Sequence, residues 1–182
     1  MYRSLTSSKF FVPVSILLIA ITAIITRLPQ LYSPHLLLDE DECVLGLMAK
    51  HMVEGKEVAL FFWGQVYGFS LVETSLISCF YFLFGMQDYS IKLAMLSIFI
   101  AGLIFFYKTL LVISPKNKWL ALAITLLFIL LPTWAVWSMK ARGGYLTSFF
   151  LSSLCTWLLF KETRSEIITY LLIGVLLATI FL

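Results

Sequence analysis

The sequence predicts an all-α fold, a polytopic bundle of transmembrane helices with an external loop that contains amphipathic juxtamembrane helices. Hydrophobic residues make up 61% of the chain and its mean hydropathy is +0.98, well above the values of ordinary soluble domains. A helix needs roughly 20 mostly apolar residues to cross a bilayer, and charge-free stretches recur along the chain. They cover residues 10–26, 58–72, 74–87, 93–107, 119–139, 143–160 and 167–182. We therefore expect one transmembrane domain over residues 1–182.

The first predicted span covers residues 10–28. Arg3 and Lys9 precede it, and basic residues favour the cytoplasmic side of a membrane. No small-x-small cleavage pattern follows the apolar run, so we expect a retained helix and not a removed signal peptide. The segment after this helix then lies outside the cell.

Residues 33–87 form the predicted external acidic loop. Residues 33–68 contain six acids and two lysines, a balance of −4, and four of these acids are adjacent at positions 39–42. A carboxylate costs roughly 3 kcal/mol or more at the centre of a bilayer. The acidic part of this segment is therefore expected in water.

A surface helix is predicted directly after the adjacent acids. Val44, Leu47, Met48 and His51 recur at helical spacing, and Gly55 follows the last of them. The acids come at the start of this helix, where the helix macrodipole favours negative charge. We expect about four turns of amphipathic helix on the membrane surface.

Residues 58–87 allow two interpretations, because Glu73 interrupts an otherwise apolar stretch. If they form a juxtamembrane hairpin, Lys140 and Arg142 lie outside, beside the acidic loop. If they cross the membrane once, every later span is inverted. Basic residues favour the first arrangement slightly. Its cytoplasmic cations are Arg3, Lys9, Lys108, Lys116, Lys118, Lys161 and Arg164, whereas those of the second are Arg3, Lys9, Lys92, Lys140 and Arg142.

About four further spans are predicted within residues 93–182, at 93–114, 119–139, 143–160 and 167–182. Short connections such as SPKNK and KETRSE join them, so neighbouring helices are expected to pack antiparallel. The last apolar run continues to Leu182 without a flanking charge. We therefore expect this chain to be the N-terminal part of a longer protein.

Charge and cysteine content exclude some classes of function. Thirteen basic residues against ten acidic ones give a net charge of +3, too small an excess to indicate nucleic acid as a partner. The cysteines, Cys43, Cys79 and Cys155, are scattered and form no CxxC motif. Neither a disulfide framework nor a zinc site is indicated.

Two segments contain residue types that suit a binding site. The first, FFWGQVYGFSLVE at 61–73, follows the acidic cluster and carries Gln65 and Tyr67. Aromatic and amide groups of this kind hold sugars or head groups. The second, WSMKARGGYLTS at 137–148, places two cations and two glycines before Tyr145.

The second segment suits a phosphate group. An arginine such as Arg142 binds phosphate oxygens in a bidentate manner, and Lys140 adds a second cation. Glycines expose backbone amides that an anion can approach closely. The alternative for both cations is anchoring at a membrane edge.

These motifs resemble those of bacterial family 39 membrane glycosyltransferases, relatives of the protein O-mannosyltransferases and of lipid A aminoarabinose transferase. The resemblance rests on DEDECVLGLMAKHMVEGKEVALFFWGQVYG, LFG and MKARGGY. The family pattern of Asp-Glu, three residues and Gly-Leu-Met-Ala matches Asp41, Glu42 and residues 46–49. Its aromatic-Gly-Gln-x-Tyr stretch matches 63–67, and its Lys-x-Arg-Gly-Gly-Tyr stretch matches 140–145.

The resemblance implies a GT-C fold and a multi-pass enzyme of the cytoplasmic (inner) membrane. Such enzymes move a sugar, with inversion, from a polyprenyl-phosphate carrier to an acceptor hydroxyl on the non-cytoplasmic face. The implied partners are the lipid-linked donor and membrane lipid, with a protein or glycan acceptor left open.

The resemblance also implies roles for individual residues. Asp41 is the expected catalytic base, with Glu42 beside it, and Arg142 and Lys140 are expected to bind the donor phosphate. No cofactor is required, although Asp39 and Asp41 are candidate ligands for a divalent cation. Gln65, Tyr67 and Tyr145 are expected to contact substrate.

The chain departs from the family pattern after Tyr67. The family continues x-Gly-Ser-Leu-Glu, whereas here Gly68 comes one place earlier and Glu73 one place later. The resemblance therefore assigns no role to Glu73.

Two other classes of function remain open from the sequence. A transporter or flippase for a lipid-linked sugar would also need acids and cations near a membrane face, but it predicts carboxylates inside the spans. Only Glu73 is placed for that. A non-catalytic, truncated membrane protein is the third alternative.

Overall fold

A computed structural model describes residues 8–33, 38–161 and 166–181, and every element of regular secondary structure in these ranges is a helix. The predicted all-α fold is confirmed for this part of the chain. Arg3, Arg164 and Leu182, which entered the sequence predictions, lie outside the described residues. The helices are α1 (Ser8–Ile25), α2 (Leu28–Leu31), α3 (Glu40–Val53), α4 (Leu71–Phe84), α5 (Asp88–Ile113), α6 (Lys118–Leu130), α7 (Pro132–Trp137), α8 (Tyr145–Phe160) and α9 (Glu166–Phe181).

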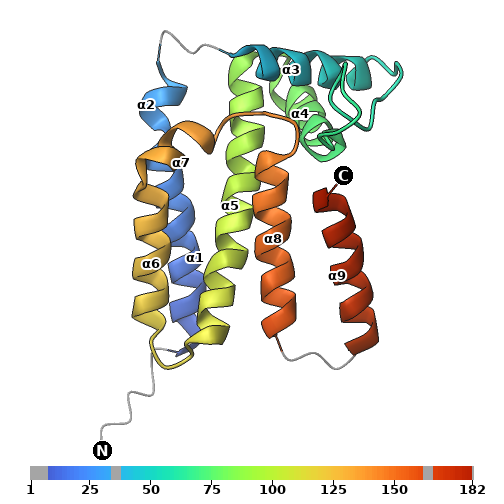
Figure 1. The fold of residues 1–182 in the computed structure, drawn as a ribbon. Helices are drawn as coiled ribbons and strands as arrows, with labels where there is room; N and C mark the ends of the chain where they lie inside the picture. Colours follow the sequence, from blue (N-terminus) through green and yellow to red (C-terminus); the bar gives the residue numbers. More distant parts are fainter. Residues whose placement is uncertain (1–7, 34–37, 162–165, 182) are drawn as a thin grey trace, which may run out of the picture.

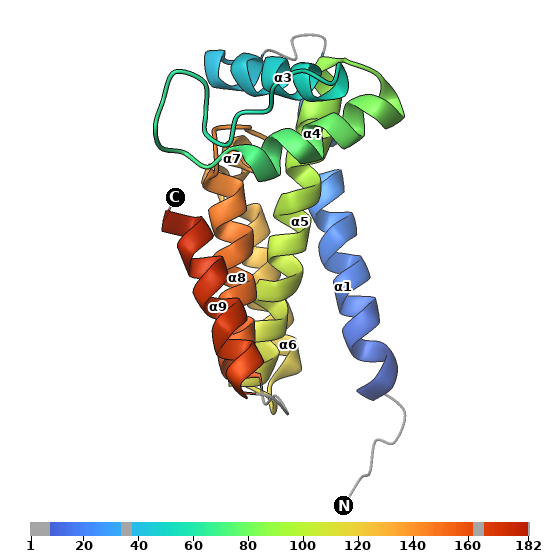
Figure 2. The same cartoon turned by 90° about the vertical axis from the view of Figure 1, so that its right-hand side faces the viewer.

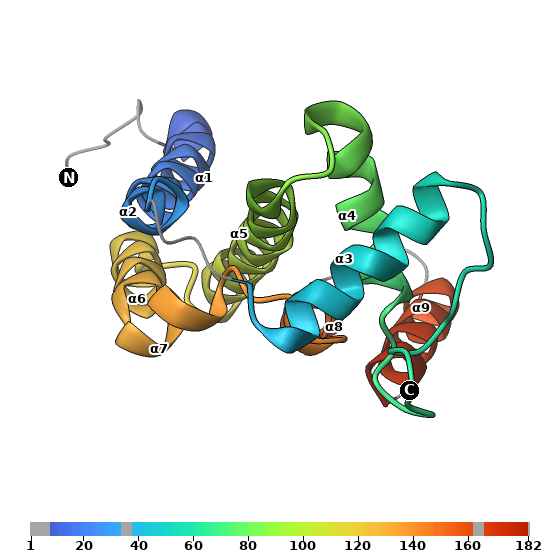
Figure 3. The same cartoon turned by 90° about the horizontal axis from the view of Figure 1, so that it is seen from above.

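The longest helix, α5, stands at the centre of the bundle (Figure 1). It packs against α1 and α6 on one side and against α8 on the other, and α9 lies outside α8 (Figure 3). Ile91, Met95, Phe99 and Leu103 of α5 are almost completely buried in this core. Because α5 contacts elements on both sides, the helices at the two edges are positioned relative to it.

Two helices lie across one end of the bundle. Figure 2 shows α3 and α4 over the end at which α5 begins, and α4 packs against both α3 and α5. Residues 58–87 therefore stay at this end and do not run the length of the bundle. The loop that carries Lys140 and Arg142 lies at the same end, as the first of the two charge arrangements requires.

By length and composition, two helical segments among the described residues are able to span a membrane. They are Phe10–Leu31 and Asp88–Ile113, and the other apolar helices are shorter. The second segment begins at Asp88, five residues before the start predicted for this span. At roughly 1.5 Å per residue, these segments have the length of a hydrocarbon core.

The predicted continuous span at 119–139 is wrong, because Pro132 divides it into α6 and α7. Proline lacks the amide hydrogen that a helix interior needs and disfavours helical geometry at the preceding residue. Leu131 accordingly adopts φ −59° and ψ 131°. With 13 residues, α6 is roughly 20 Å long and does not by itself match the thickness of a bilayer core.

Arg27, which lies between α1 and α2, forms hydrogen bonds on both sides of this break. Its side chain is 2% exposed. Its Nη2 donates to the carbonyl oxygens of Ile129 and Trp134, each at 3.0 Å, and its Nε donates to the Ser138 hydroxyl at 3.0 Å. Carbonyls in the last turn of a helix lack partners within the helix, so Arg27 supplies donors where the break removes them. Its guanidinium also lies 5.3 Å from the ring centre of Phe99.

We expect Arg27→Met to lower the free energy of unfolding by about 3 kcal/mol, because it leaves buried acceptors without a donor. Detergent-based unfolding followed by circular dichroism measures the effect. Lys50→Met is the matched control: its side chain is 49% exposed at the surface, and it should leave stability nearly unchanged. Equal stability of the two variants would contradict the bracing role of Arg27.

Candidate functional site

The adjacent acids begin α3 through a capping box. Asp39 is the N-cap residue, and its Oδ1 accepts a hydrogen bond from the Glu42 amide at 3.1 Å. In return, Glu42 Oε2 accepts from the Asp39 amide at 3.1 Å. This reciprocal pairing satisfies amides that the first turn leaves free. The prediction of an acidic helix start is confirmed.

The buried face of α3 agrees only in part with the predicted one: Met48 is 3% exposed and Val44 packs against the core, as predicted. Leu47, which the spacing placed on the apolar face, is 50% exposed, whereas Leu45 and Ala49 are completely buried. The true contact face also contains Gly46, at which an added Cβ would lie 2.9 Å from the Tyr81 hydroxyl and from Ile91 Cδ1. A face that includes a glycine and an acidic residue is not marked by its hydrophobicity, so the spacing of apolar residues did not reveal it.

The acidic residue on that face is Glu42, which points into the protein. It is 0% exposed, and its Oε1 lies 2.5 Å from the Nζ of Lys92 on α5, which is itself 1% exposed. Glu42 was predicted to act beside Asp41, but here its carboxylate joins α3 to α5. Sequence reasoning missed Lys92 as its partner. The signal that could have revealed this partner was a lysine near the start of an otherwise apolar helix.

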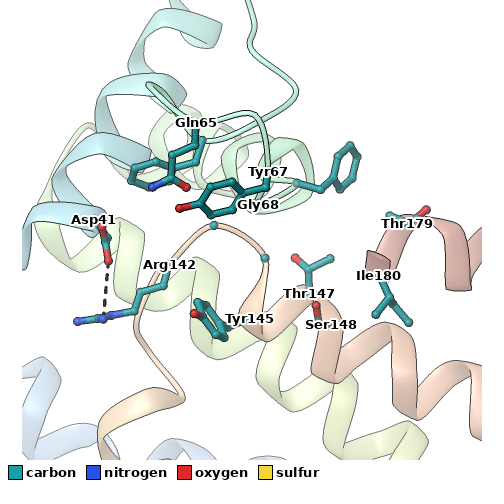
Figure 4. A pocket seen from close by; sticks show the side chains of 14 residues that line it. Asp41, Gln65, Tyr67, Gly68, Arg142, Tyr145, Thr147, Ser148, Thr179 and Ile180 are labelled. Carbon is teal, nitrogen blue, oxygen red and sulfur yellow. Dashed lines mark ion pairs between the residues drawn. The ribbon is translucent and has the colours of Figure 1, made fainter. Parts of the chain in front are cut away.

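The loop between α7 and α8 binds the start of α3. Lys140 Nζ lies 2.8 Å from Asp39 Oδ2, and Arg142 Nη2 lies 2.6 Å from the same oxygen. Arg142 Nη1 is 3.7 Å from Asp41 Oδ2 (Figure 4). The two predicted phosphate-binding cations and the predicted base are therefore neighbours, although they are about 100 residues apart in the sequence.

These contacts shift the pKa values of Asp39 and Arg142. Partial burial opposes ionisation of Asp39, but hydrogen bonds from Lys140, from the Glu42 amide and from Arg142 outweigh it and lower the pKa of Asp39 to about 2. The hydrogen bond with Asp39 raises the pKa of Arg142. Asp39 and Arg142 are accordingly both ionised at neutral pH.

Glu73 of α4 holds the glycine loop, which contains Gly143 and Gly144. It is 0% exposed, and it accepts hydrogen bonds from the Gly143 amide at 3.1 Å and from the Thr147 hydroxyl at 3.5 Å. Gly143 and Gly144 have φ of 66° and 111°, values that glycine adopts without strain. Burial raises the pKa of the Glu73 carboxyl, while backbone amides of the loop oppose this shift.

The glycine amides thus bind an internal carboxylate. The sequence interpretation assigned them to an incoming phosphate and assigned no role to Glu73, and the structure differs on both points. This carboxyl group accepts its hydrogen bonds at the start of α8, where backbone amides lack partners within the helix. Glu73 therefore fixes the loop from which Arg142 and Tyr145 project.

A cavity of about 340 Å³ opens between α3, the loop after it and the start of α8 (Figure 4). Five of the predicted site residues line it: Asp41, Gln65, Tyr67, Arg142 and Tyr145. The α8 residues Thr147 and Ser148 and the α9 residues Thr179 and Ile180 also line it, and the sequence did not point to them. Glu42 is turned away into the core, and Asp39 and Lys140 lie beside the cavity.

Arg142 is positioned by an aromatic neighbour, and its Nε is buried. Its guanidinium lies 5.0 Å from the ring centre of Trp137, and Trp137 in turn lies 5.9 Å from Tyr145. The described residues offer no acceptor to the buried Nε of Arg142. One face of the guanidinium is therefore supported by an aromatic ring, while one of its donors has no partner within residues 8–33, 38–161 and 166–181.

The candidate metal ligands, Asp39 and Asp41, both contact Arg142. Within the described ranges, no group of three or more His, Cys, Asp or Glu side chains is placed to hold a metal ion. A divalent cation at this pair of carboxylates would compete with the guanidinium for the same oxygens.

Comparison with protein-family models, with curated proteins and with solved structures finds no match to this chain.

The buried pair of Glu42 and Lys92 can be tested by a double-mutant cycle. Glu42→Gln and Lys92→Met should each lower the free energy of unfolding by about 3–5 kcal/mol, because each leaves an unpaired buried charge. The double variant should lose less than the two single variants together. Detergent-based unfolding measures all four proteins.

The matched control for this cycle is the exposed pair of Glu54 and Lys56, whose nitrogen and oxygen are also 2.5 Å apart. Glu54→Gln and Lys56→Met should show no measurable coupling, because water screens an exposed pair. Equal coupling at the two pairs would contradict the anchoring role of Glu42.

Proposed function

We propose that this chain is a membrane glycosyltransferase, or the N-terminal portion of one. In this proposal it transfers a sugar from a polyprenyl-phosphate carrier to an acceptor hydroxyl, with inversion. The proposal rests on the family motifs quoted above and on the composition of the cavity at the end of the bundle.

One observation carries the proposal: a carboxylate and a guanidinium meet at a cavity that also contains amide and aromatic groups. Asp41 is 45% exposed at its side chain and faces Arg142 across 3.7 Å. Tyr67 and Tyr145 are both more than 60% exposed and line the same cavity. Such groups suit a sugar bonded to a phosphate.

The proposed reaction assigns each group one task. The acceptor oxygen attacks the anomeric carbon, its proton passes to Asp41, and the bond between that carbon and the phosphate oxygen breaks. The leaving phosphate keeps the electron pair, and Arg142 and Lys140 stabilise its growing charge. Gln65 and the two tyrosines orient the sugar.

A lipid-borne donor would account for the apolar character of the chain. A polyprenyl chain resides in the bilayer, so its head group reaches a protein at the membrane surface. In the proposed multi-pass arrangement, α1 and α5 cross the cytoplasmic membrane and the cavity faces the non-cytoplasmic side. The shorter apolar helices pack around them in the bilayer.

The base assignment predicts that Asp41→Asn lowers the rate of sugar transfer by about 10²- to 10⁴-fold, because an amide cannot accept the hydroxyl proton. Transfer of radiolabelled sugar in isolated membranes measures the rate. Glu40→Gln, an exposed acid one residue earlier, is the control and should retain most of the activity. Undiminished transfer by Asp41→Asn would refute the assignment.

The proposed orientation predicts opposite labelling of two loops. Val66, 90% exposed in the loop after α3, and Asn117, between α5 and α6, are replaced by cysteine in turn. The exposed Cys43 and Cys79 are first changed to serine. A membrane-impermeant maleimide on intact cells should label Val66→Cys and leave Asn117→Cys unlabelled until the cells are lysed. The reverse pattern would invert the orientation.

A further inference from the structure

Both cations that we assign to the donor phosphate already bind a carboxylate. Lys140 Nζ and Arg142 Nη2 lie 2.8 Å and 2.6 Å from a single oxygen, Asp39 Oδ2. The other oxygen of Asp39 is held by the start of α3. One anionic oxygen between a lysine and an arginine is also the arrangement that a phosphate oxygen adopts.

This three-residue contact is accessible from solution. The side chains of Lys140, Arg142 and Asp39 are 23%, 29% and 27% exposed. A second cavity adjoins it, lined by Leu38, Asp39, Glu40, Asp41 and Arg142. The contact thus differs from the sealed pair of Glu42 and Lys92, whose side chains are 0% and 2% exposed. An accessible anion can therefore exchange with Asp39, whereas it cannot reach Glu42.

The energetics also allow exchange. A partly exposed ion pair contributes little net stability, and a phosphate offers Arg142 two oxygens at once. Asp39 offers Arg142 only Oδ2, because its Oδ1 caps α3. A phosphate therefore gains a second contact with the guanidinium that this carboxylate does not provide.

We infer that Asp39 is an internal substitute for the anionic head group of the donor. Asp39 holds Lys140 and Arg142 in position while no donor is bound, and an isoprenoid phosphate displaces its Oδ2 from both cations. This inference rests on the proposed function and adds to it a means of controlling the same site.

The exchange has a consequence for Asp41. Arg142 contacts both carboxylates, through Nη2 to Asp39 and through Nη1 to Asp41. When the phosphate binds the Arg142 guanidinium, Asp41 is no longer paired with it. Asp41 is then free to accept the hydroxyl proton. Donor binding would then release the base only when there is a donor to react.

The test is the affinity of the purified protein, in detergent micelles, for farnesyl phosphate, a short isoprenoid phosphate. Isothermal titration calorimetry compares the wild type with Asp39→Asn. Asparagine caps a helix as well as aspartate does, so this change removes the charge and keeps the cap. We expect Asp39→Asn to lower the Kd by about three- to tenfold, which lies within the range for loss of two competing, partly exposed ion pairs.

The matched control is Glu40→Gln, which removes one charge from the adjacent exposed residue. It should change the Kd less than about twofold, since it leaves the contact of Asp39 intact. If Glu40→Gln tightens binding as much as Asp39→Asn does, the effect is one of overall charge and the exchange is refuted. Asp39→Ser, another uncharged N-cap, gives an independent measurement should the asparagine variant fold poorly.

Two further ligands identify what is recognised. Inorganic phosphate should show the same tightening in Asp39→Asn, because it shares the anion. Farnesol, which has the chain without the phosphate, should bind the two proteins equally. Equal tightening for farnesol would refute the exchange.

The outcomes separate this inference from the proposed function. If the wild type and Asp39→Asn both fail to bind farnesyl phosphate, the phosphate role of Arg142 is refuted, and the exchange with it. If the wild type binds and Arg142→Met abolishes binding, while Asp39→Asn is unchanged or weaker than the wild type, only the exchange is refuted.

Discussion

The buried ion pair between Glu42 and Lys92 fixes the surface helix α3 on the central helix α5, and the geometry of the cavity depends on it. Charges removed from water cost several kcal/mol each unless they are paired, so a placement of α3 that separates Glu42 from Lys92 is disfavoured. In that placement Glu42 is 0% exposed, and Asp39 and Asp41 reach the loop that precedes α8. The pair thus orients α3 as well as attaching it.

Two other buried ionisable side chains hold the irregular backbone on either side of α7. Arg27 donates to carbonyls near the break at Pro132, and Glu73 accepts from the glycine loop before α8. Backbone polar groups outside regular helices must find partners when they are buried. Arg27 and Glu73 thus provide hydrogen-bond partners for backbone groups on both sides of α7. The segment that carries Lys140 and Arg142 is therefore held at both ends.

The run of four acids therefore has more than one use. Successive residues of a helix point about 100° apart, which follows from 3.6 residues per turn. Asp41 consequently faces the cavity, while Glu42, the next residue, faces the core. Asp39 caps the helix and binds the two cations. A single acidic motif thus supplies a helix cap, an anchor and an exposed carboxylate.

The sequence by itself determined the all-helical class, the acidic start of α3 and five of the residues that line the cavity. Charge, hydrophobicity and motif spacing are local properties that can be read along the chain. It did not determine which face of α3 is buried, because that face contains Gly46 and Glu42 and is recognised only through Tyr81, Ile91 and Lys92. Only the tertiary structure decided that the glycine amides bind Glu73 and that Asp39 forms ion pairs with Lys140 and Arg142. Both contacts join residues about 70 to 100 positions apart, so their energies depend on how the helices pack.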